Sequence, residues 1–259
     1  MKAIVLAAGY ATRLYPLTQT IAKPLLPVGG RPMLDRIVDR ILEVPEVDAV
    51  HVVTNHKFAD SFVNWAEAHE QRVPLHVHDD ETTTEDDRLG AIGDVNFVVA
   101  TAGLEEDDLL VIAGDNLFDF SLADYVAFWR GKGEASAVGL YDVGSVETAT
   151  RFGVVEVDED GRVLSMVEKP ERPSSTLAAT ATYLYHRAHV PLLNTYLAEG
   201  NSPDAPGSFL VWLHRRAPVY GYRIEGEWFD IGDRGQLLEA DNRLREREGL
   251  PLRSEYAVD

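Results

Sequence analysis

Short apolar runs alternate with longer amphipathic stretches along the first half of the chain. The apolar runs predict buried strands at residues 2–6, 49–54, 74–77, 108–113 and 135–141. Apolar positions at helical spacing predict helices at residues 32–42, 59–68, 89–101 and 122–129. This alternation of strand and helix is typical of a parallel sheet with helices on both of its faces.

The pattern changes after about residue 142. Two β-rich runs, 153–157 and 162–167, flank a turn that ends in Gly161 and predict a hairpin. The remaining pattern predicts a strand at 177–185, a helix at 207–216, a strand at 219–224 and a closing helix at 235–248. No linker separates the two parts, so we expect one domain over residues 1–259. Its fold class is α/β: a Rossmann-like mixed, mostly parallel sheet flanked by helices, with a smaller β-rich part.

Composition excludes several classes of protein. The chain has 43 acidic and 24 basic residues, a formal net charge of −19, which disfavours nucleic-acid binding and opposes an anionic membrane. It has no cysteine, which excludes disulfides, thiolate metal sites and cysteine nucleophiles. The apolar N-terminus is short and runs straight into a turn containing Arg13, unlike a secretory signal. We therefore expect a cytoplasmic protein with no nucleic-acid or membrane partner.

The loop after the first strand has the composition of a phosphate site. Small residues at 7–9 let a ligand approach the backbone, and Arg13 and Lys23 supply two cations. The alternative to a phosphate site is an ordinary strand-to-helix turn with two solvated cations. The glycine patterns of dinucleotide-binding proteins and of P-loops are both absent, which disfavours a nicotinamide dehydrogenase.

Two aspartates are candidate ligands for a hard cation. Asp115 follows a buried strand, at the sheet edge where open α/β folds bind ligands, and its carboxylate suits Mg²⁺. It could equally cap the helix after Phe120. Asp230 could bind the same cation or lie in a turn, and Asp233 is predicted to cap the closing helix. Sequence separation alone does not show whether Asp115 and Asp230 meet.

An ordered block of motifs near the N-terminus carries a family resemblance. Leu-Ala-Ala-Gly at 6–9, Thr-Arg-Leu at 12–14, Pro-Leu-Thr at 16–18 and Lys-Pro-Leu-Leu-Pro-Val at 23–28 resemble the opening of the sugar-1-phosphate nucleotidyltransferases. That family includes the glucose-1-phosphate thymidylyltransferases. The resemblance extends from residue 3 to about residue 245. One departure is Ala11, where the family usually has glycine.

The resemblance implies a role for each matching residue. It implies that residues 1–142 form a nucleotide-binding half and residues 143–259 a half that binds the sugar phosphate. The catalytic cations would be Arg13 and Lys23 on the triphosphate and Lys169 on the sugar phosphate. Asp115 and Asp230 would bind Mg²⁺. The implied substrate contacts are Ala8, Gly9, Asn116, Gly153 and Glu168.

The implied activity is transfer of a nucleoside monophosphate from a nucleoside triphosphate to a sugar 1-phosphate, with release of pyrophosphate. The family favours dTTP or UTP and glucose 1-phosphate. Residues 81–94 lack the glutamine with which thymidylyltransferases read the base. Gly90 could still allow close approach to the base, and Arg88 could face a base carbonyl or pair with Asp86 or Asp87.

This weak match in residues 81–94 keeps alternative functions open. One is a cytidylyl- or guanylyltransferase that acts on a cyclitol phosphate or a phosphonate. A non-catalytic sugar-nucleotide sensor is another, although a sensor does not need the full set of charged residues. Because relatives are often dimers or tetramers, a homo-oligomer is also an open expectation.

Overall fold

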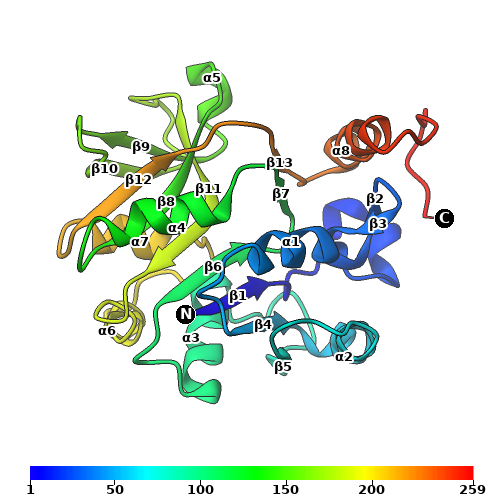
Figure 1. Cartoon of the computed structure of the whole chain (residues 1–259), viewed down its shortest axis with the longest axis horizontal. Coiled ribbons are helices and arrows are strands. Elements are labelled where there is room, and N and C mark those ends of the chain that lie inside the picture. The colour runs from blue at the N-terminus through cyan, green and yellow to red at the C-terminus, as the bar shows by residue number, and fades with distance from the viewer. Residues whose placement is uncertain (259) are drawn as a thin grey trace.

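The computed structural model describes residues 1–258, and its centre is a nine-stranded sheet (Figure 1). Four parallel strands in the order β5-β4-β1-β6 form one side of the sheet. Their bounds are β1 (Lys2–Leu6), β4 (Ala49–Thr54), β5 (Leu75–Asp79) and β6 (Leu109–Ala113). The central strands are apolar and covered on both faces, as expected for a parallel sheet. The predicted parallel core is confirmed.

Antiparallel strands extend the sheet beyond β6. The strand β11 (Leu177–Tyr185) pairs with β6, and the predicted hairpin forms next to it as β9 (Gly153–Val157) and β10 (Val163–Glu168). The strand β8 (Ser136–Asp142) also pairs with β11, and β12 (Val219–Arg223) runs parallel to β8. One sheet therefore continues from the N-terminal half of the chain into the C-terminal half, as the predicted mixed α/β class requires.

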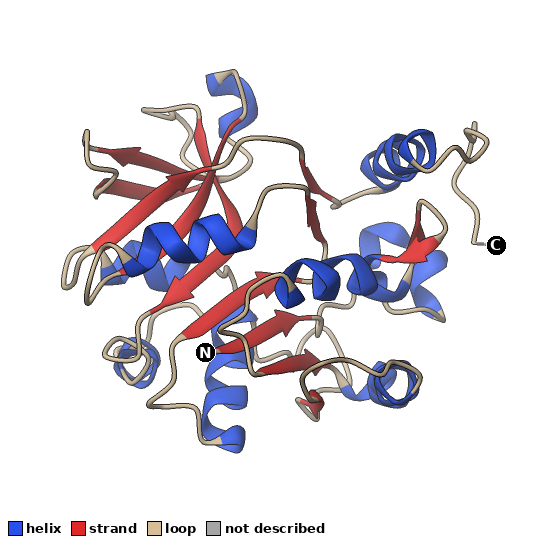
Figure 2. Ribbon diagram, viewed as in Figure 1, coloured by secondary structure: helices blue, strands red, loops and turns tan. Residues whose placement is uncertain are grey.

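Helices cover both faces of this sheet (Figure 2). One hydrophobic cluster joins the sheet to α1 (Met33–Leu42), α2 (Ala59–Glu67), α4 (Leu122–Arg130) and α8 (Arg234–Arg247). A second cluster joins it to α3 (Ala91–Ala102), α6 (Leu192–Ala198) and α7 (Ser208–Leu213). The helix α7 is shorter than predicted, because its last residues turn back and the amides of Arg216 and Ala217 both bond to Leu213. Within residues 1–258, no helix has the length and apolar character needed to cross a membrane.

Several short elements were not predicted. A two-stranded sheet pairs β7 (Asn116–Phe118) with β13 (Trp228–Asp230), and a smaller one pairs β2 (Pro27–Val28) with β3 (Arg31–Pro32). The other short helices are α5 (Val146–Ala149), η1 (Thr12–Leu14), η2 (Leu17–Gln19), η3 (Lys23–Leu25) and η4 (His56–Phe58). Elements of two to four residues show no hydrophobic period, so the sequence pattern could not reveal them.

Candidate active site

The two candidate metal-binding aspartates lie side by side. Asp115 follows β6, and Asp230 ends β13, which pairs with β7 so that Asp230 lies opposite Asn116 (Figure 1). The amide of Ile231 donates to the carbonyl of Asp115 over 3.1 Å. The side-chain amide of Asn116 donates to Oδ1 of Asp115 at 2.9 Å and to Oδ1 of Asp230 at 3.3 Å. The β7–β13 pairing thus brings together two aspartates that lie 115 positions apart in the sequence. The alternative cap role of Asp115 is wrong, because Ser121 caps α4.

Lys23 stands against this pair of carboxylates. Its buried Nζ lies 2.6 Å from Oδ2 of Asp115. Burial raises the pKa of Asp115, but the charge of Lys23 and hydrogen bonds from Lys23 and Asn116 outweigh it and leave this pKa below its usual value. Burial and then the charge of Asp115 raise the pKa of Asp230. The site therefore holds two close carboxylates with one neighbouring ammonium.

This donor set fits a magnesium ion. Mg²⁺ prefers carboxylate and phosphate oxygens and is usually held by one or two carboxylates together with the substrate. Asp115 and Asp230 provide two carboxylates whose mutual repulsion a cation would relieve. Among residues 1–258 there is no group of three or more histidine and carboxylate side chains that could hold a metal on its own. Substrate oxygens would have to complete the coordination.

The first loop leaves its backbone open to a ligand. A Cβ added to Gly9 would meet no atom within 4 Å. Asn55, at the end of β4, donates from its side chain to the carbonyl of Ala8 at 2.8 Å and so holds the loop in place. Sequence analysis missed Asn55; its position directly after a predicted strand is the only signal that pointed to it. Ala11 adopts a left-handed φ of 49°, which glycine adopts more readily.

Arg13 extends from this loop toward Gly232. Its side chain is exposed, and its Nη1 lies 3.7 Å from the position that a Cβ on Gly232 would occupy. Gly232 is two residues beyond Asp230. The guanidinium group therefore lies beside the segment that links β13 to α8 and is accessible from solvent. Asp233 caps α8 by accepting from the amide of Gln236 at 3.0 Å, as predicted.

The candidate acceptor residues lie at one end of the β9–β10 hairpin. Gly153 and Glu168 are directly opposite one another, and a Cβ on Gly153 would lie 2.9 Å from Oε2 of Glu168. A Cβ on Gly207, at the start of α7, would lie 3.2 Å from the same oxygen. Burial raises the pKa of Glu168, and the charge of Lys169 partly offsets this effect. Lys169 is exposed, and its amide bonds to the carbonyl of Phe152.

Residues 86–93, the segment expected to face the base, are held by the loop that contains Pro203 and Asp204. Gly90 has a φ of 78°, and a Cβ there would lie 2.8 Å from the carbonyl oxygen of Pro203. The same carbonyl accepts from the amide of Ile92 at 2.8 Å. The expected pairing of Arg88 with Asp86 or Asp87 is wrong: Arg88 lies 3.4 Å from Asp204 and also contacts Glu85. The carboxylate of Asp87 is instead occupied by the backbone amides of Thr83 and Thr84.

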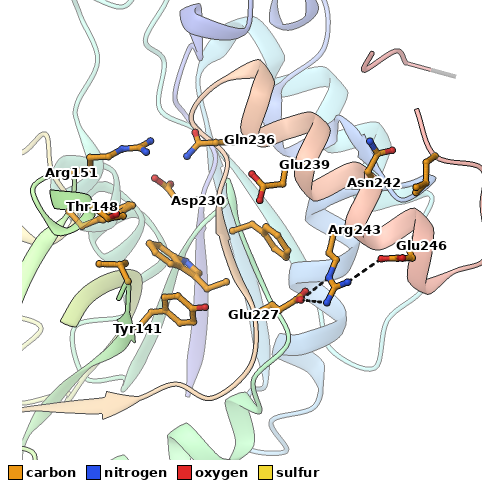
Figure 3. Close-up of a pocket in the computed structure, with 15 residues that line it drawn as sticks. Tyr141, Thr148, Arg151, Glu227, Asp230, Gln236, Glu239, Asn242, Arg243 and Glu246 are labelled. Carbon is orange, nitrogen blue, oxygen red and sulfur yellow. Dashed lines mark hydrogen bonds and ion pairs between the residues drawn. The ribbon is translucent and has the colours of Figure 1, made fainter. Parts of the chain in front are cut away.

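A cavity of about 730 Å³ opens beside Asp230 (Figure 3). We call it the α8 pocket, and its lining residues include Tyr141, Arg151, Phe152, Trp228, Gln236 and Glu239. Sequence analysis assigned a role to none of these six. Three of them lie next to recognised motifs, since Arg151 and Phe152 precede Gly153 and Trp228 precedes Asp230. Tyr141 and Glu239 carry no such signal.

Comparison with known proteins adds to this geometry. The family model described as nucleotidyl transferase matches residues 2–247. The chain is 28% identical over 254 residues to the UTP–glucose-1-phosphate uridylyltransferase AglF of Haloferax volcanii, covering 95% of this chain and 97% of that protein. It is 26% identical over 244 residues to the bifunctional protein GlmU of Methanococcus aeolicus, covering 94% of this chain and 54% of that protein.

A solved structure of UDP-glucose pyrophosphorylase complexed with UDP-glucose shares the fold, with a TM-score of 0.81 at 21% identity. The match covers 95% of this chain and 98% of that one. The chain spans about half the length of the first curated relatives that it matches.

Proposed function

The chain belongs to the nucleotidyl transferase family, and from that membership we propose that it transfers a nucleoside monophosphate from a nucleoside triphosphate to a sugar 1-phosphate. An oxygen of the acceptor phosphate attacks the α-phosphorus, the bond from that phosphorus to the bridging oxygen breaks, and pyrophosphate leaves. The observation that carries this proposal is the convergence of Asp115, Asp230 and Lys23 next to the open first loop.

This chemistry needs positioning and charge neutralisation rather than a protein nucleophile. The exposed Arg13 and the buried Lys23 would hold the triphosphate and neutralise the departing pyrophosphate. Lys169 would hold the acceptor phosphate, and Glu168 would accept from a sugar hydroxyl beside Gly153. Asp115 and Asp230 would hold Mg²⁺, which when bound supplies positive charge to the phosphate oxygens.

The names of the relatives indicate which substrates to assay first. UTP and glucose 1-phosphate are the substrates in the name of the AglF relative, and we propose UTP or dTTP with glucose 1-phosphate for this chain. The absence of a glutamine in residues 81–94 favours a second candidate, cytidylyl or guanylyl transfer. Arg88 adds no support to it, because its guanidinium group is paired with Asp204. A screen of the common triphosphates against several phosphorylated acceptors separates the two candidates.

Replacement of Lys169 tests the proposed mechanism. Lys169 is exposed and makes no side-chain hydrogen bond or ion pair with any residue in 1–258, so Lys169→Ala should fold normally. Loss of one charge-stabilising group typically costs about 10²–10³ in kcat. We expect that loss in pyrophosphate release. Lys132→Ala, on a loop of the nucleotide-binding half and outside the site, is the control for loss of a lysine charge. Near-wild-type turnover of Lys169→Ala would falsify the assigned role.

Replacement of Asp115 tests the carboxylate pair. Asp115→Asn keeps the shape of the side chain but removes one of the two negative charges, so pyrophosphate release should fall by a similar ~10²–10³-fold. The dependence of the residual rate on magnesium concentration should shift to higher concentrations. An unchanged magnesium dependence would contradict the proposed metal site.

A further inference from the structure

The α8 pocket extends the site away from the reacting atoms. Arg151, Asp230 and Gln236 lie at one end of it, and Arg243 and Glu246 lie on α8 at the other end (Figure 3). Because Asp230 lines the pocket, a molecule bound there reaches the carboxylate pair. Gly153 and Glu168, the proposed contacts of the first sugar, do not line the pocket, but Phe152 does, and it directly precedes Gly153. The pocket therefore borders the place proposed for the first sugar.

One wall of the pocket is a polar face of α8. Gln236, Glu239, Arg243 and Glu246 are spaced by three or four residues, so they share one side of the helix. From Gln236 to Glu246 this face runs about 15 Å along the helix axis, at 1.5 Å per residue. This length exceeds what a single sugar ring needs.

The opposite wall is aromatic. The ring of Trp228 packs against Phe152 at 5.1 Å and against Tyr141 at 5.6 Å between centroids. The indole is fixed because its Nε1 donates to Oδ1 of Asn116 at 2.7 Å. Fixed aromatic faces suit the C–H faces of sugar rings, since such faces bury apolar area and leave the hydroxyls free at the edge.

Some polar side chains of the pocket already have a hydrogen-bond or ion-pair partner in the protein, and others do not. Arg243 is held by Glu227 at 2.6 Å and by Glu246 at 3.1 Å. Within residues 1–258, the side chains of Arg151 and Glu239 form no ion pair or hydrogen bond, and Gln236 uses only its oxygen, on the amide of Gly232. A carboxylate, an amide nitrogen and a guanidinium group thus remain for a ligand.

The geometry points to an acceptor that extends beyond one sugar ring, with a second neutral, polyhydroxylated group lying along α8. This inference rests on the proposed function. The carboxylate of Glu239 accepts from hydroxyls but repels anions, and at the far end the charge of Arg243 is already neutralised by Glu227 and Glu246. Arg151, whose guanidinium group lies over the ring of Phe152, stands at the Asp230 end and would add its charge to that of Lys169 on the acceptor phosphate. The pocket therefore suits a ligand that has a phosphate at one end and neutral hydroxyls at the other. A disaccharide 1-phosphate has this form, whereas a second nucleotide does not.

The test compares acceptors of different length. Glucose 1-phosphate, maltose 1-phosphate and cellobiose 1-phosphate are assayed with the preferred triphosphate by pyrophosphate release. We expect a higher kcat/KM for at least one of the disaccharide phosphates. Glu239→Ala should lower that value about tenfold, as expected for a lost hydrogen bond to a charged group, and leave the KM of the triphosphate unchanged. Glu255→Ala, in the exposed tail outside the pocket, is the control.

A second measurement separates this inference from the proposed function. Isothermal titration of each disaccharide phosphate into the full chain without triphosphate reports binding alone. Binding that Glu239→Ala weakens, without turnover of any acceptor, would support the pocket and overturn the proposed function. Turnover of glucose 1-phosphate, with both disaccharide phosphates poorer and Glu239→Ala indistinguishable from wild type, would overturn the inference alone.

Discussion

Asn116 connects the carboxylates of Asp115 and Asp230 to the α8 pocket. Its side chain is buried, donates to Asp115 and Asp230, and accepts from the indole of Trp228. Because an indole N–H can only donate, Trp228 fixes the oxygen of the amide on its own side. The amide nitrogen then faces both carboxylates. The side chain thus transmits the position of an aromatic wall of the pocket to the proposed metal site, a role distinct from the substrate contact that the resemblance implies.

Asp94 and Asp80 form a buried pair of acids at the start of α3. One oxygen of each carboxyl has no other partner within residues 1–258, as expected for two carboxyls that share a proton. Burial, and then the charge of Asp80 and a hydrogen bond with it, raises the pKa of Asp94 to about 8. The folded protein therefore retains a proton that the unfolded chain releases near pH 4.

This pair predicts a pH dependence of stability. Since the folded-state pKa is raised, the contribution of Asp94 is complete below about pH 4 and is lost as the pH rises toward about 8. Asp94→Asn supplies an amide donor to Asp80 at every pH. We expect the wild type to lose stability relative to this variant by up to ~1 kcal/mol per pH unit in that window.

Urea unfolding of the wild type and of Asp94→Asn at pH 5, 6, 7 and 8 measures this difference. The Asp86→Asn variant, exposed on the neighbouring loop, serves as the control and should follow the wild type. Parallel stability curves for the wild type and Asp94→Asn would show that no proton is shared.

At the scale of elements, Asp108 ties three segments together. It is 1% exposed at the start of β6, and its Oδ2 lies 2.7 Å from Arg130 at the end of α4 and 2.9 Å from Arg187 after β11. Burial raises the pKa of Asp108, but hydrogen bonds from Arg187 and Arg130 outweigh it and hold this pKa well below its usual value. The carboxylate thus joins the parallel core to the antiparallel extension.

Asp108→Asn should destabilise the protein by about 2–3 kcal/mol at pH 7, less than for a fully buried ion pair because both arginines are partly exposed. Since the folded pKa is lowered, the contribution is present above about pH 4 and is lost as the pH falls below it. The difference from wild type in urea unfolding should therefore shrink at pH 3. Asp107→Asn, the neighbouring residue, is the control, and an equal effect of both variants would contradict the role of Asp108.

The long elements were predictable because each carries its own signal. The continuous apolar run of β6 and the helical spacing in α1 predict those elements without reference to the rest of the chain. The β7–β13 pair carries no such signal, because three-residue strands owe their structure to tertiary contacts. Asp115 and Asp230 come together only because β7 pairs with β13. Spacing along the sequence therefore could not show whether the two aspartates meet.

The residues of the site also differ in whether the local sequence identifies them. Arg13, Lys23 and Asp115 follow predicted strands or lie in the first loop, so sequence motifs could select them as candidates. The α8 pocket is formed by β8, the segment around Arg151, β13 and α8, and its walls meet only through tertiary packing. The contact between Gly90 and Pro203 is also tertiary, and no local pattern indicated it.

At the scale of the whole molecule, the charge of the protein opposes its proposed substrates. The net charge of −19 repels a triphosphate and a sugar phosphate at long range, whereas Arg13, Lys23 and Lys169 attract them only at short range. Salt screens the long-range term first, since the Debye length falls from about 30 Å at 0.01 M to about 8 Å at 0.15 M. We expect kcat/KM for the triphosphate to rise roughly two- to fivefold over this interval at constant free magnesium. The value of kcat at saturation, measured alongside, should change little, because the bound state is held by local contacts. A steady fall in kcat/KM with added salt would mean that the local cations, not the overall charge, dominate the approach of the substrate.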